Sequence, residues 1–294
     1  MQASLTCSTL FPNREKKVLG WEDIFRDAAE AGFRYIDISF PTKIEEINRT
    51  ILSADWKQWA RELASLLKKY GLTAVQSHAT YWTAMKPWAA EAEKLELYKT
   101  IISRCVDISA LLDIPWVVVH PLCAANTYDF PMEKVLDVNE RFYLSFLPAM
   151  KGTDTGVAIE NLYVGELQSA RHMMMLGERL DSEKYGYCWD TGHANITRQD
   201  HSTSIRMLGD RLKATHINDN RGAQDEHLLP YMGNVPWEKV TSALACIGYR
   251  GAMNYEAYGM AENLPIRYRA DAFAYAYRVA NDLINESEQQ EEKQ

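Results

Sequence analysis

Cysteine is scarce in this sequence, and no cysteine lies near another. There are five in 294 residues: Cys7, Cys105, Cys123, Cys188 and Cys246. The number is odd and no C-x-x-C pair occurs, which argues against a disulfide framework and against a thiolate zinc site. Reduced thiols are typical of the cytoplasm, so a cytoplasmic location is expected.

Long hydrophobic runs and concentrations of positive charge are also absent. No apolar stretch approaches the ~20 residues that span a bilayer, and the N-terminus lacks the basic-then-apolar pattern of a signal peptide. The net charge is −8, and no local basic stripe offsets it. Because an acidic surface repels polyanions, nucleic acid is a disfavoured partner. We expect a soluble protein that binds neither membrane nor nucleic acid.

What the sequence does contain is a regular succession of short apolar strands and amphipathic helices. Hydrophobic residues make up 47% of the chain, enough for a substantial core. Strands are predicted at residues 4–10, 35–40, 72–77, 116–119, 157–159, 185–189, 212–215 and 251–255. Helices are predicted at residues 21–31, 56–70, 91–112, 132–150, 166–176, 202–208, 236–246 and 266–283, with a polar loop through about residue 54. Eight strand-helix repeats are the pattern of a (β/α)8 barrel, an α/β fold.

A doubly wound open sheet is the alternative architecture. It usually carries a glycine-rich phosphate-binding turn after its first strand, and this sequence has none there. No linker interrupts the repeats, so residues 1–284 are expected to form a single TIM-barrel domain. Residues 285–294 are rich in Glu, Gln and Lys, and we expect a disordered C-terminal tail.

Ionisable side chains recur at or just after the predicted strand ends. They include five of the seven histidines and three carboxylates: His78, His120, His193, His216, His227, Glu160, Asp190 and Glu256. All strands of a barrel open on one face, so these side chains should converge there. A single residue of this kind could equally cap the next helix, as Asp190 could. A crowd of unpaired carboxylates would repel one another, and a bound cation relieves that repulsion.

Four of these residues follow four successive strands: Glu160, Asp190, His216 and Glu256. Neighbouring strand ends lie close enough for one divalent ion to bridge them. Three carboxylates and one imidazole form a hard-to-borderline ligand set, which favours manganese, zinc, magnesium or cobalt ions. Cys188 stands two residues before Asp190, and we expect it to pack in the core rather than bind metal.

The segments around these strand ends resemble the sugar phosphate isomerase/epimerase family. That family has a xylose isomerase-like TIM barrel and includes ketose 3-epimerases and endonuclease IV. The matching segments span most of the chain after residue 72: residues 119–121, 159–161, 189–193, 216–220, 225–230, 233–237 and 254–256. Together they are specific for the superfamily and do not single out a substrate.

The resemblance implies one divalent metal ion bound by the four residues named above. It also implies that Glu160 and Glu256 are catalytic: one removes a proton next to a carbonyl and the other returns one, through a metal-stabilised enediolate. Further residues are expected to contact substrate: His78, His120, Glu166, His193, Arg221 and His227. Glu166 could instead be a carboxylate favoured by a helix dipole, and Arg221 a solvated loop residue.

The predicted function is therefore a metal-dependent isomerase or epimerase acting on a sugar or related α-hydroxy carbonyl compound. A lyase of the same family, an inosose or 3-dehydroshikimate dehydratase, is the main alternative, because it begins with the same proton abstraction. A barrel that binds a ligand without catalysis is a further alternative, disfavoured because binding alone needs no pair of base-capable glutamates. Family members also pair as dimers or tetramers, which leaves a homo-oligomer open.

An abasic-site endonuclease is a less favoured reading. Its three-metal site has nine ligands, and nine residues here can be aligned with them: His78, His120, Glu160, Asp190, His193, His216, Asp225, His227 and Glu256. The resemblance therefore leaves open a site that binds more than one metal ion. The acidic charge opposes DNA binding, and the loop after the third strand carries aromatic and apolar residues instead of basic or wedge residues: Tyr81, Trp82, Met85 and Trp88. Such a loop could cover an apolar sugar face, pack in the fold or form an oligomer contact.

Overall fold

The eight strands form one parallel barrel in the computed structural model, which describes residues 1–9, 15, 18–81, 92–123, 131–261 and 264–291. The strands are β1 (Gln2–Cys7), β2 (Tyr35–Ser39), β3 (Thr73–His78), β4 (Trp116–Val119), β5 (Gly156–Glu160), β6 (Tyr185–Asp190), β7 (Leu212–His216) and β8 (Ala252–Tyr255). They hydrogen-bond in the order β7-β6-β5-β4-β3-β2-β1-β8. The predicted (β/α)8 barrel is confirmed.

Closure of the barrel depends on the residues after β7. Ile217 forms a parallel bridge with Tyr255. The amide of Ile217 donates to the carbonyl of Asn254 at 2.7 Å, and the amide of Glu256 donates to the carbonyl of Ile217 at 3.1 Å. These bonds bring the ends of β7 and β8 together, so the residues that follow the two strands become neighbours.

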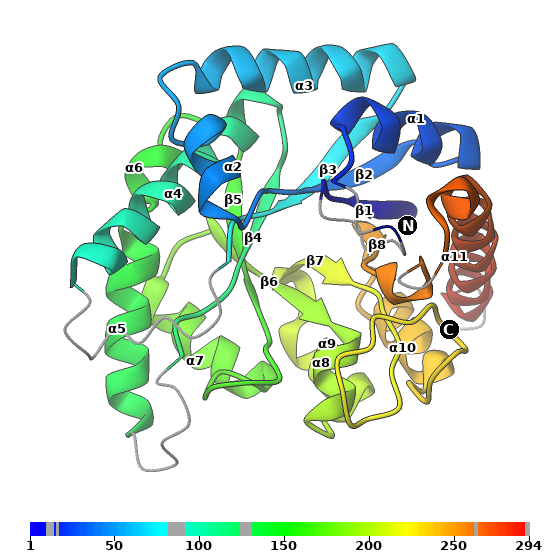
Figure 1. Ribbon diagram of the computed structural model, residues 1–294. Helices are drawn as coiled ribbons and strands as arrows, with labels where there is room; N and C mark the ends of the chain where they lie inside the picture. Colours follow the sequence, from blue (N-terminus) through cyan, green and yellow to red (C-terminus); the bar gives the residue numbers. More distant parts are fainter. Residues whose placement is uncertain (10–14, 16–17, 82–91, 124–130, 262–263, 292–294) are drawn as a thin grey trace.

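Helices surround the strands, as Figure 1 shows. They are α1 (Trp21–Ala31), α2 (Ile44–Arg49), α3 (Trp56–Tyr70), α4 (Ala92–Leu111), α5 (Met132–Leu144), α6 (Leu147–Met150), α7 (Ala170–Leu180), α8 (Thr191–Ile196), α9 (His201–Leu208), α10 (Trp237–Cys246) and α11 (Arg269–Glu291), with the 3-10 turns η1 (Gly209–Arg211), η2 (Tyr258–Ala261) and η3 (Ile266–Tyr268). Gly32 and Gly71 end α1 and α3 in the left-handed conformation, with φ of 113° and 63°, as their positions predict. Within the described ranges, no helix combines the length and apolar character that crossing a bilayer requires.

Several helices differ from the predicted ones. The polar stretch before residue 54 contains α2, and α8 begins directly after β6 without a loop. The helix predicted at 132–150 is two helices, and α6 has Pro148 in its first turn, a position that suits proline because no intrahelical amide is needed there. The helix predicted from residue 166 begins at Ala170, because Ser169 caps it by accepting a hydrogen bond from the amide of His172 at 3.2 Å.

The expected tail is helical as far as Glu291, so the predicted disorder is wrong for residues 285–291. Ser287 is fully buried and donates to the carbonyl of Thr241 on α10 at 3.1 Å. Glu286 accepts a hydrogen bond from the Tyr231 hydroxyl at 2.9 Å. Composition predicted disorder because the polar residues outnumber the apolar ones, whereas Ser287 and Glu286 form tertiary hydrogen bonds in these last turns.

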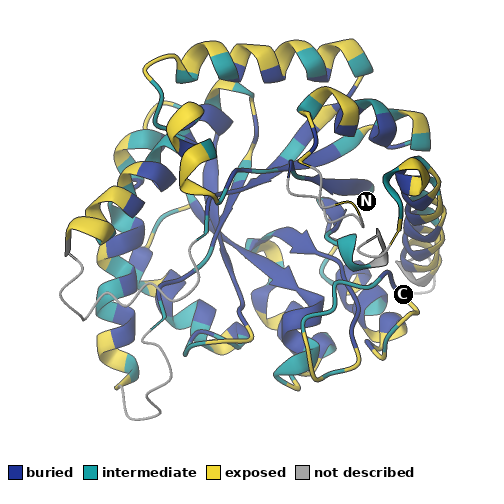
Figure 2. Ribbon diagram, viewed as in Figure 1, coloured by how far each residue is buried: buried dark blue, intermediate teal, exposed yellow. Residues whose placement is uncertain are grey.

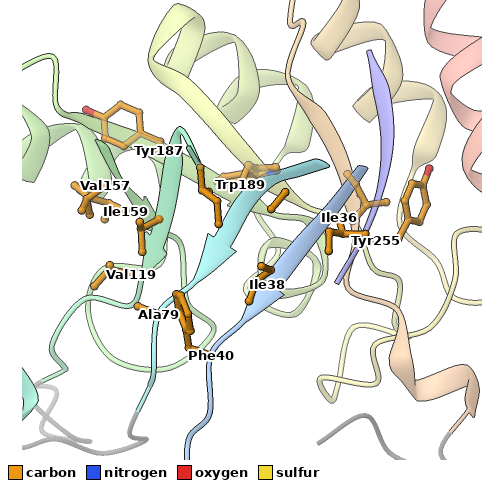
Figure 3. Close-up of a cluster of buried hydrophobic side chains, with 14 of the residues drawn as sticks. Ile36, Ile38, Phe40, Ala79, Val119, Val157, Ile159, Tyr187, Trp189 and Tyr255 are labelled. Atoms are coloured by element: carbon orange, nitrogen blue, oxygen red, sulfur yellow. The ribbon is translucent and has the colours of Figure 1, made fainter. Parts of the chain in front are cut away.

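Side chains alternate between the two faces of each strand, because successive residues in a β-strand point to opposite sides. The outward-facing set packs against the helices and forms the main core. Figure 3 shows part of this core, including Ile36, Ile38, Tyr187 and Trp189. In Figure 2 the strands are mostly buried, and the helices are exposed on the sides that face away from them. A one-residue slip would reverse the faces of a strand, so this burial fixes the register.

The inward-facing set differs between the two halves of the barrel. From β4 to β7, small apolar side chains form a separate cluster: Val118, Ala158, Cys188 and Ala214. From β8 through β1 to β3, buried polar side chains take their place: Ser4, Thr6, Asp37, Gln76 and Asn254. The prediction that Cys188 packs in the core is confirmed, and burial raises the pKa of its thiol to about 12.

His201 predicts a pH-dependent contribution to stability. Its side chain is buried at the start of α9, its Nδ1 accepts from the Trp189 indole at 3.4 Å, and burial lowers its pKa to about 4. The unfolded imidazole binds a proton near pH 6.5. The unfolded state therefore gains protons first, and stability contributed by His201 is lost as pH falls from about 6.5 towards 4.

The expected size of this loss between pH 7 and pH 5 is about 2 kcal/mol, at about 1.4 kcal/mol per pH unit below 6.5. The measurement is the free energy of unfolding in urea at both pH values, for the wild type and His201→Gln. The variant should be less stable at pH 7 because it alters a packed site, yet it should lose about 2 kcal/mol less than the wild type on acidification. An identical loss in both proteins would show that His201 does not stay neutral in the fold.

Candidate metal centre

Four ionisable side chains meet at the carboxyl ends of neighbouring strands. Glu160, Asp190 and His216 are the last residues of β5, β6 and β7. Glu256 directly follows β8, and closure of the barrel places it beside β7. Each residue offers one ligand atom, and these atoms all lie within 4.8 Å of one another. We call these residues the four-residue group.

The imidazole of His216 lies between the three carboxylates. Its Nδ1 is 2.9 Å from Oε1 of Glu160, 3.2 Å from Oε2 of Glu256 and 3.7 Å from Oδ2 of Asp190. The side chains of Glu160, Asp190 and His216 are at most 1% exposed, whereas that of Glu256 is 12% exposed. Among the four, Glu256 is the residue that solvent reaches.

The two oxygens of Asp190 have separate roles. Oδ1 accepts from the amide of His193 at 2.6 Å and so caps α8. Oδ2 faces His216 and accepts from the Asn218 amide at 2.9 Å. Asn161 fixes the backbone of Asp190 from the neighbouring strand end, donating to its carbonyl at 3.0 Å and accepting from its amide at 2.7 Å. The predicted cap is therefore confirmed, while metal binding through the second oxygen stays a prediction.

A second group shares Glu160 with the first. His78, His120 and Glu160 also place ligand atoms within 4.8 Å of one another. Oε2 of Glu160 is 3.3 Å from Nε2 of His78 and 2.9 Å from Nε2 of His120. Nδ1 of His78 donates to the carbonyl of Ala79 at 2.8 Å, which leaves Nε2 with its lone pair towards Glu160. The sequence predicts substrate contacts for His78 and His120, and the distances also suit a second metal ion.

Asp225 connects two further predicted residues at the rim. Its Oδ2 is 3.5 Å from Nε2 of His193 and 3.0 Å from Nε2 of His227. Each histidine is held through Nδ1, His193 by the carbonyl of Asn161 and His227 by the carbonyl of Glu256, both at 2.8 Å. The two imidazoles are thus fixed to the backbone of the strand ends that carry the catalytic candidates.

Charges within the site shift several pKa values strongly. Burial opposes ionisation of Glu160, but positive charge on His216 and His120 holds its pKa well below the ordinary value. Burial raises the pKa of Asp190 to about 6. Burial disfavours protonated His216, yet the carboxylates of Glu160 and Glu256 raise its pKa well above the ordinary value. Burial makes a carboxylate harder to ionise, and a positive charge beside it makes it easier to ionise.

The residues of the four-residue group fit a divalent cation. Three carboxylates and one imidazole are oxygen-rich and contain no thiolate, which suits manganese, magnesium, cobalt or zinc. The ligand atoms already lie around one centre. Nε2 of His216 is buried and makes no hydrogen bond to any described group, while Nδ1 faces the carboxylates. The imidazole therefore presents Nδ1 to the three carboxylates.

Two predicted substrate contacts lie in loops and belong to neither group. Glu166 is half-buried between β5 and α7, near Cys123 and His172, and is not the start of a helix. The side chain of Arg221 is 64% exposed and pairs with Glu226 in its own loop. Their contact with substrate stays a prediction. Of the predicted aromatic loop, Tyr81 lies with its ring centroid 5.0 Å from that of His120, and Trp82, Met85 and Trp88 lie outside the described residues.

Three residues that lie beside the four-residue group were not predicted. Asn161 and Asn218 stand inside segments that the sequence singles out, each one or two residues after a candidate ligand, and a buried polar residue there is a usable signal. Asp37 is a charge in the middle of the apolar stretch Tyr35–Ser39. Its position in β2 is itself the signal, since a carboxylate buried in a strand needs a partner.

Comparison with known proteins identifies the type of barrel. The sequence profile of the family described as xylose isomerase-like TIM barrel matches residues 25–276. This range contains all members of the four-residue group. A solved structure described as a D-tagatose 3-epimerase-like protein has 21% sequence identity and a TM-score of 0.74, and the match covers 97% of this chain and 99% of that one. At this identity, the likeness establishes the shared fold.

Sequence relatives cover only parts of the chain. The uncharacterised protein y4fM of Sinorhizobium fredii is 30% identical over 167 residues, 53% of this chain and 51% of that protein. D-psicose 3-epimerase of Enterocloster bolteae is 29% identical over 106 residues, 36% of this chain and 34% of that enzyme. The chain thus spans about half the length of the first relative and about a third of the second.

Proposed function

Because the chain belongs to the xylose isomerase-like TIM-barrel family, we propose that it is a divalent-metal-dependent isomerase or epimerase of a sugar or related α-hydroxy carbonyl compound. The observation that carries this proposal is the pair of glutamates, Glu160 and Glu256, in one group with Asp190 and His216. The D-psicose 3-epimerase among the relatives supports a ketose as the first substrate class to test.

Metal binding is assigned to the four-residue group, with one ion. Glu160, Asp190, His216 and Glu256 would hold it. A bound divalent cation supplies positive charge to substrate oxygens and so favours loss of a proton from the adjacent carbon. His78 and His120 remain assigned to substrate, with the alternative that they bind a second ion together with Glu160.

Proton transfer is assigned to the two glutamates. The pKa of Glu160 lies well below its ordinary value in this setting, and a carboxylate is the form that accepts a proton. Glu256 belongs to the same group but lies at its accessible side. One glutamate removes the proton next to the carbonyl, leaving an enediolate, and the other returns a proton. Return on the opposite face of the same carbon gives an epimer, and return on the neighbouring carbon gives an isomer.

Orientation of the substrate is assigned to the fixed imidazoles at the rim. His193 and His227 are each held through Nδ1, and Nε2 of each ring faces Oδ2 of Asp225, where a substrate hydroxyl or carbonyl oxygen would compete for it. Tyr258 stacks on His227 with ring centroids 4.3 Å apart, and its hydroxyl lies 3.1 Å from Nε2. These contacts hold the ring against rotation, which is the preorganisation that an orienting residue needs.

The test is turnover in deuterium oxide. The protein is stripped of metal, reloaded separately with manganese, cobalt, magnesium or zinc, and incubated with a panel of ketoses that includes D-psicose, D-tagatose and D-fructose. The expected result is a product isomeric with its substrate, carrying one solvent deuteron, seen by NMR and mass spectrometry. A product that has lost water would mean a lyase, and a panel without turnover or exchange under any metal would refute the proposed substrate class.

A further inference from the structure

A layer of polar side chains lies inside the barrel one step below the four-residue group. Ser4 donates to Asn254 at 2.9 Å. The Asn254 amide donates to Thr6 at 2.8 Å and to Asp37 at 3.2 Å. The Gln76 amide donates to Asp37 at 2.7 Å. The layer therefore converges on one carboxylate, which comes from β2, on the far side of the barrel from β5 and β6.

Asp37 is fully buried, and its hydrogen bonds are unequal. Both amides donate to Oδ2, whereas Oδ1 has no partner among the described residues. Two neutral amides only partly compensate a buried carboxylate, and such a group is costly unless something positive or strongly donating faces it. A position that served packing alone would be better filled by an apolar or amide side chain.

The group that faces Asp37 is Nε2 of His216. Nε2 of His216 lies 3.8 Å from Oδ2 of Asp37, and it also has no hydrogen-bond partner among the described residues. The other nitrogen, Nδ1, is the one directed at the carboxylates of the four-residue group. The imidazole of His216 thus lies between the buried carboxylate of Asp37 and the three carboxylates of the four-residue group.

We propose that Asp37 is a positioning residue that selects the tautomer of His216. A neutral imidazole carries one N–H, and a carboxylate facing Nε2 draws the proton to that nitrogen. Nδ1 is then left with its lone pair, which is the form that binds a metal ion. Asp37 so prepares a ligand without touching substrate or metal. This inference rests on the metal site of the proposed function, but not on which reaction the site catalyses.

Asp37→Asn is the decisive substitution. The asparagine keeps the size of the side chain and can still accept from Gln76 with its oxygen. With that oxygen at the Oδ2 position, a neutral amide oxygen instead of a carboxylate faces Nε2 of His216, and the preference for a proton on Nε2 is weakened. Zinc affinity should fall about 10- to 100-fold, the range found for second partners of metal-bound histidines. The metal-free variant should unfold at the same temperature as the wild type or higher, because a buried charge is gone.

Gln76→Met is the matched control in the same layer. It removes one hydrogen bond to Asp37 but leaves the carboxylate opposite His216. It should lower the unfolding temperature of the metal-free protein and leave zinc affinity within about threefold of the wild type. A purely structural role for the layer predicts the reverse ranking, with zinc affinity following stability in both variants.

The experiment is titration of metal-free protein with zinc in a calorimeter, for the wild type and both variants, with thermal unfolding in chelator alongside. As a second readout, ¹⁵N-histidine spectra of the zinc-loaded wild type should show Nε2 of His216 protonated. The proposal is overturned if Asp37→Asn binds zinc as tightly as the wild type, if both variants lose affinity equally, or if Nδ1 carries the proton. Binding of metal without turnover under manganese, cobalt, magnesium or zinc would refute the proposed reaction alone, and a wild type that binds none of the four metals would refute both.

Discussion

Replacing either Glu160 or Glu256 by glutamine should lower the rate of epimerisation by a factor on the order of 10³, within the usual range for loss of a positioned acid/base group. The amide keeps the shape of the side chain but neither accepts nor donates the proton. Because the two glutamates are proposed to serve the two proton transfers separately, each variant should keep slow exchange of the substrate proton in one direction only.

The measurement is NMR in deuterium oxide, starting from each epimer in turn. Glu160→Gln should exchange one epimer and Glu256→Gln the other, while neither converts one epimer into the other at a useful rate. Glu30→Gln, an exposed position on α1, is the control for a glutamate-to-glutamine change and should keep full activity. Full turnover in both site variants would contradict the acid/base assignment.

The two glutamate variants should also differ in their affinity for metal. Glu160 contributes to both candidate groups, with His216 at 2.9 Å on one oxygen and His120 at 2.9 Å on the other. Glu256 belongs only to the four-residue group. The Glu160 variant should therefore need more added metal than the Glu256 variant, and the rates of both are compared at saturating metal.

The convergence of the four-residue group could be predicted because strand polarity and strand ends are local properties of the sequence. A buried parallel strand reads as an apolar run, so the first charge after it marks the end of the strand. This logic located Glu160, Asp190 and His216, which are the terminal residues of β5, β6 and β7. The fold then brings these ends together, whatever the intervening helices do.

The supporting residues are different, because their partners are set by register across the barrel. Asp37 and His216 are far apart in sequence and lie on strands that do not pair with each other. Their approach follows from the inward alternation of β2, β7 and β8 around a closed barrel, and no spacing in the sequence encodes it. Asn218 reaches Asp190 in the same way, from the end of the next strand.

Loop residues could be named only by resemblance. Glu166 and Arg221 lie in segments whose conformation is set by local caps and ion pairs rather than by the barrel, as Ser169 and Glu226 illustrate. Loops vary more than the elements that they connect. The position of a loop residue in the sequence of a family is therefore a weaker guide to its contacts than the position of a strand-end residue.

Divalent metal should stabilise the fold strongly, because three buried or nearly buried carboxylates surround one imidazole. A ligand that binds only the folded state adds about 4 kcal/mol at a free concentration 1,000 times its dissociation constant. For a chain of this size, that corresponds to a rise in the unfolding temperature on the order of 10 °C. The measurement is calorimetric unfolding of chelator-treated protein, before and after addition of manganese, cobalt, magnesium or zinc.

Asp190→Asn separates the role of Asp190 in metal binding from its role as a helix cap. Asparagine caps helices about as well as aspartate, so its side-chain oxygen should still accept the hydrogen bond that the amide of His193 donates. The change removes one of three crowded negative charges, and the metal-free variant should unfold no lower than the metal-free wild type. Added metal should then raise its unfolding temperature by only a small part of the wild-type shift. An equal shift in the two proteins would mean that the stabilising ion binds elsewhere.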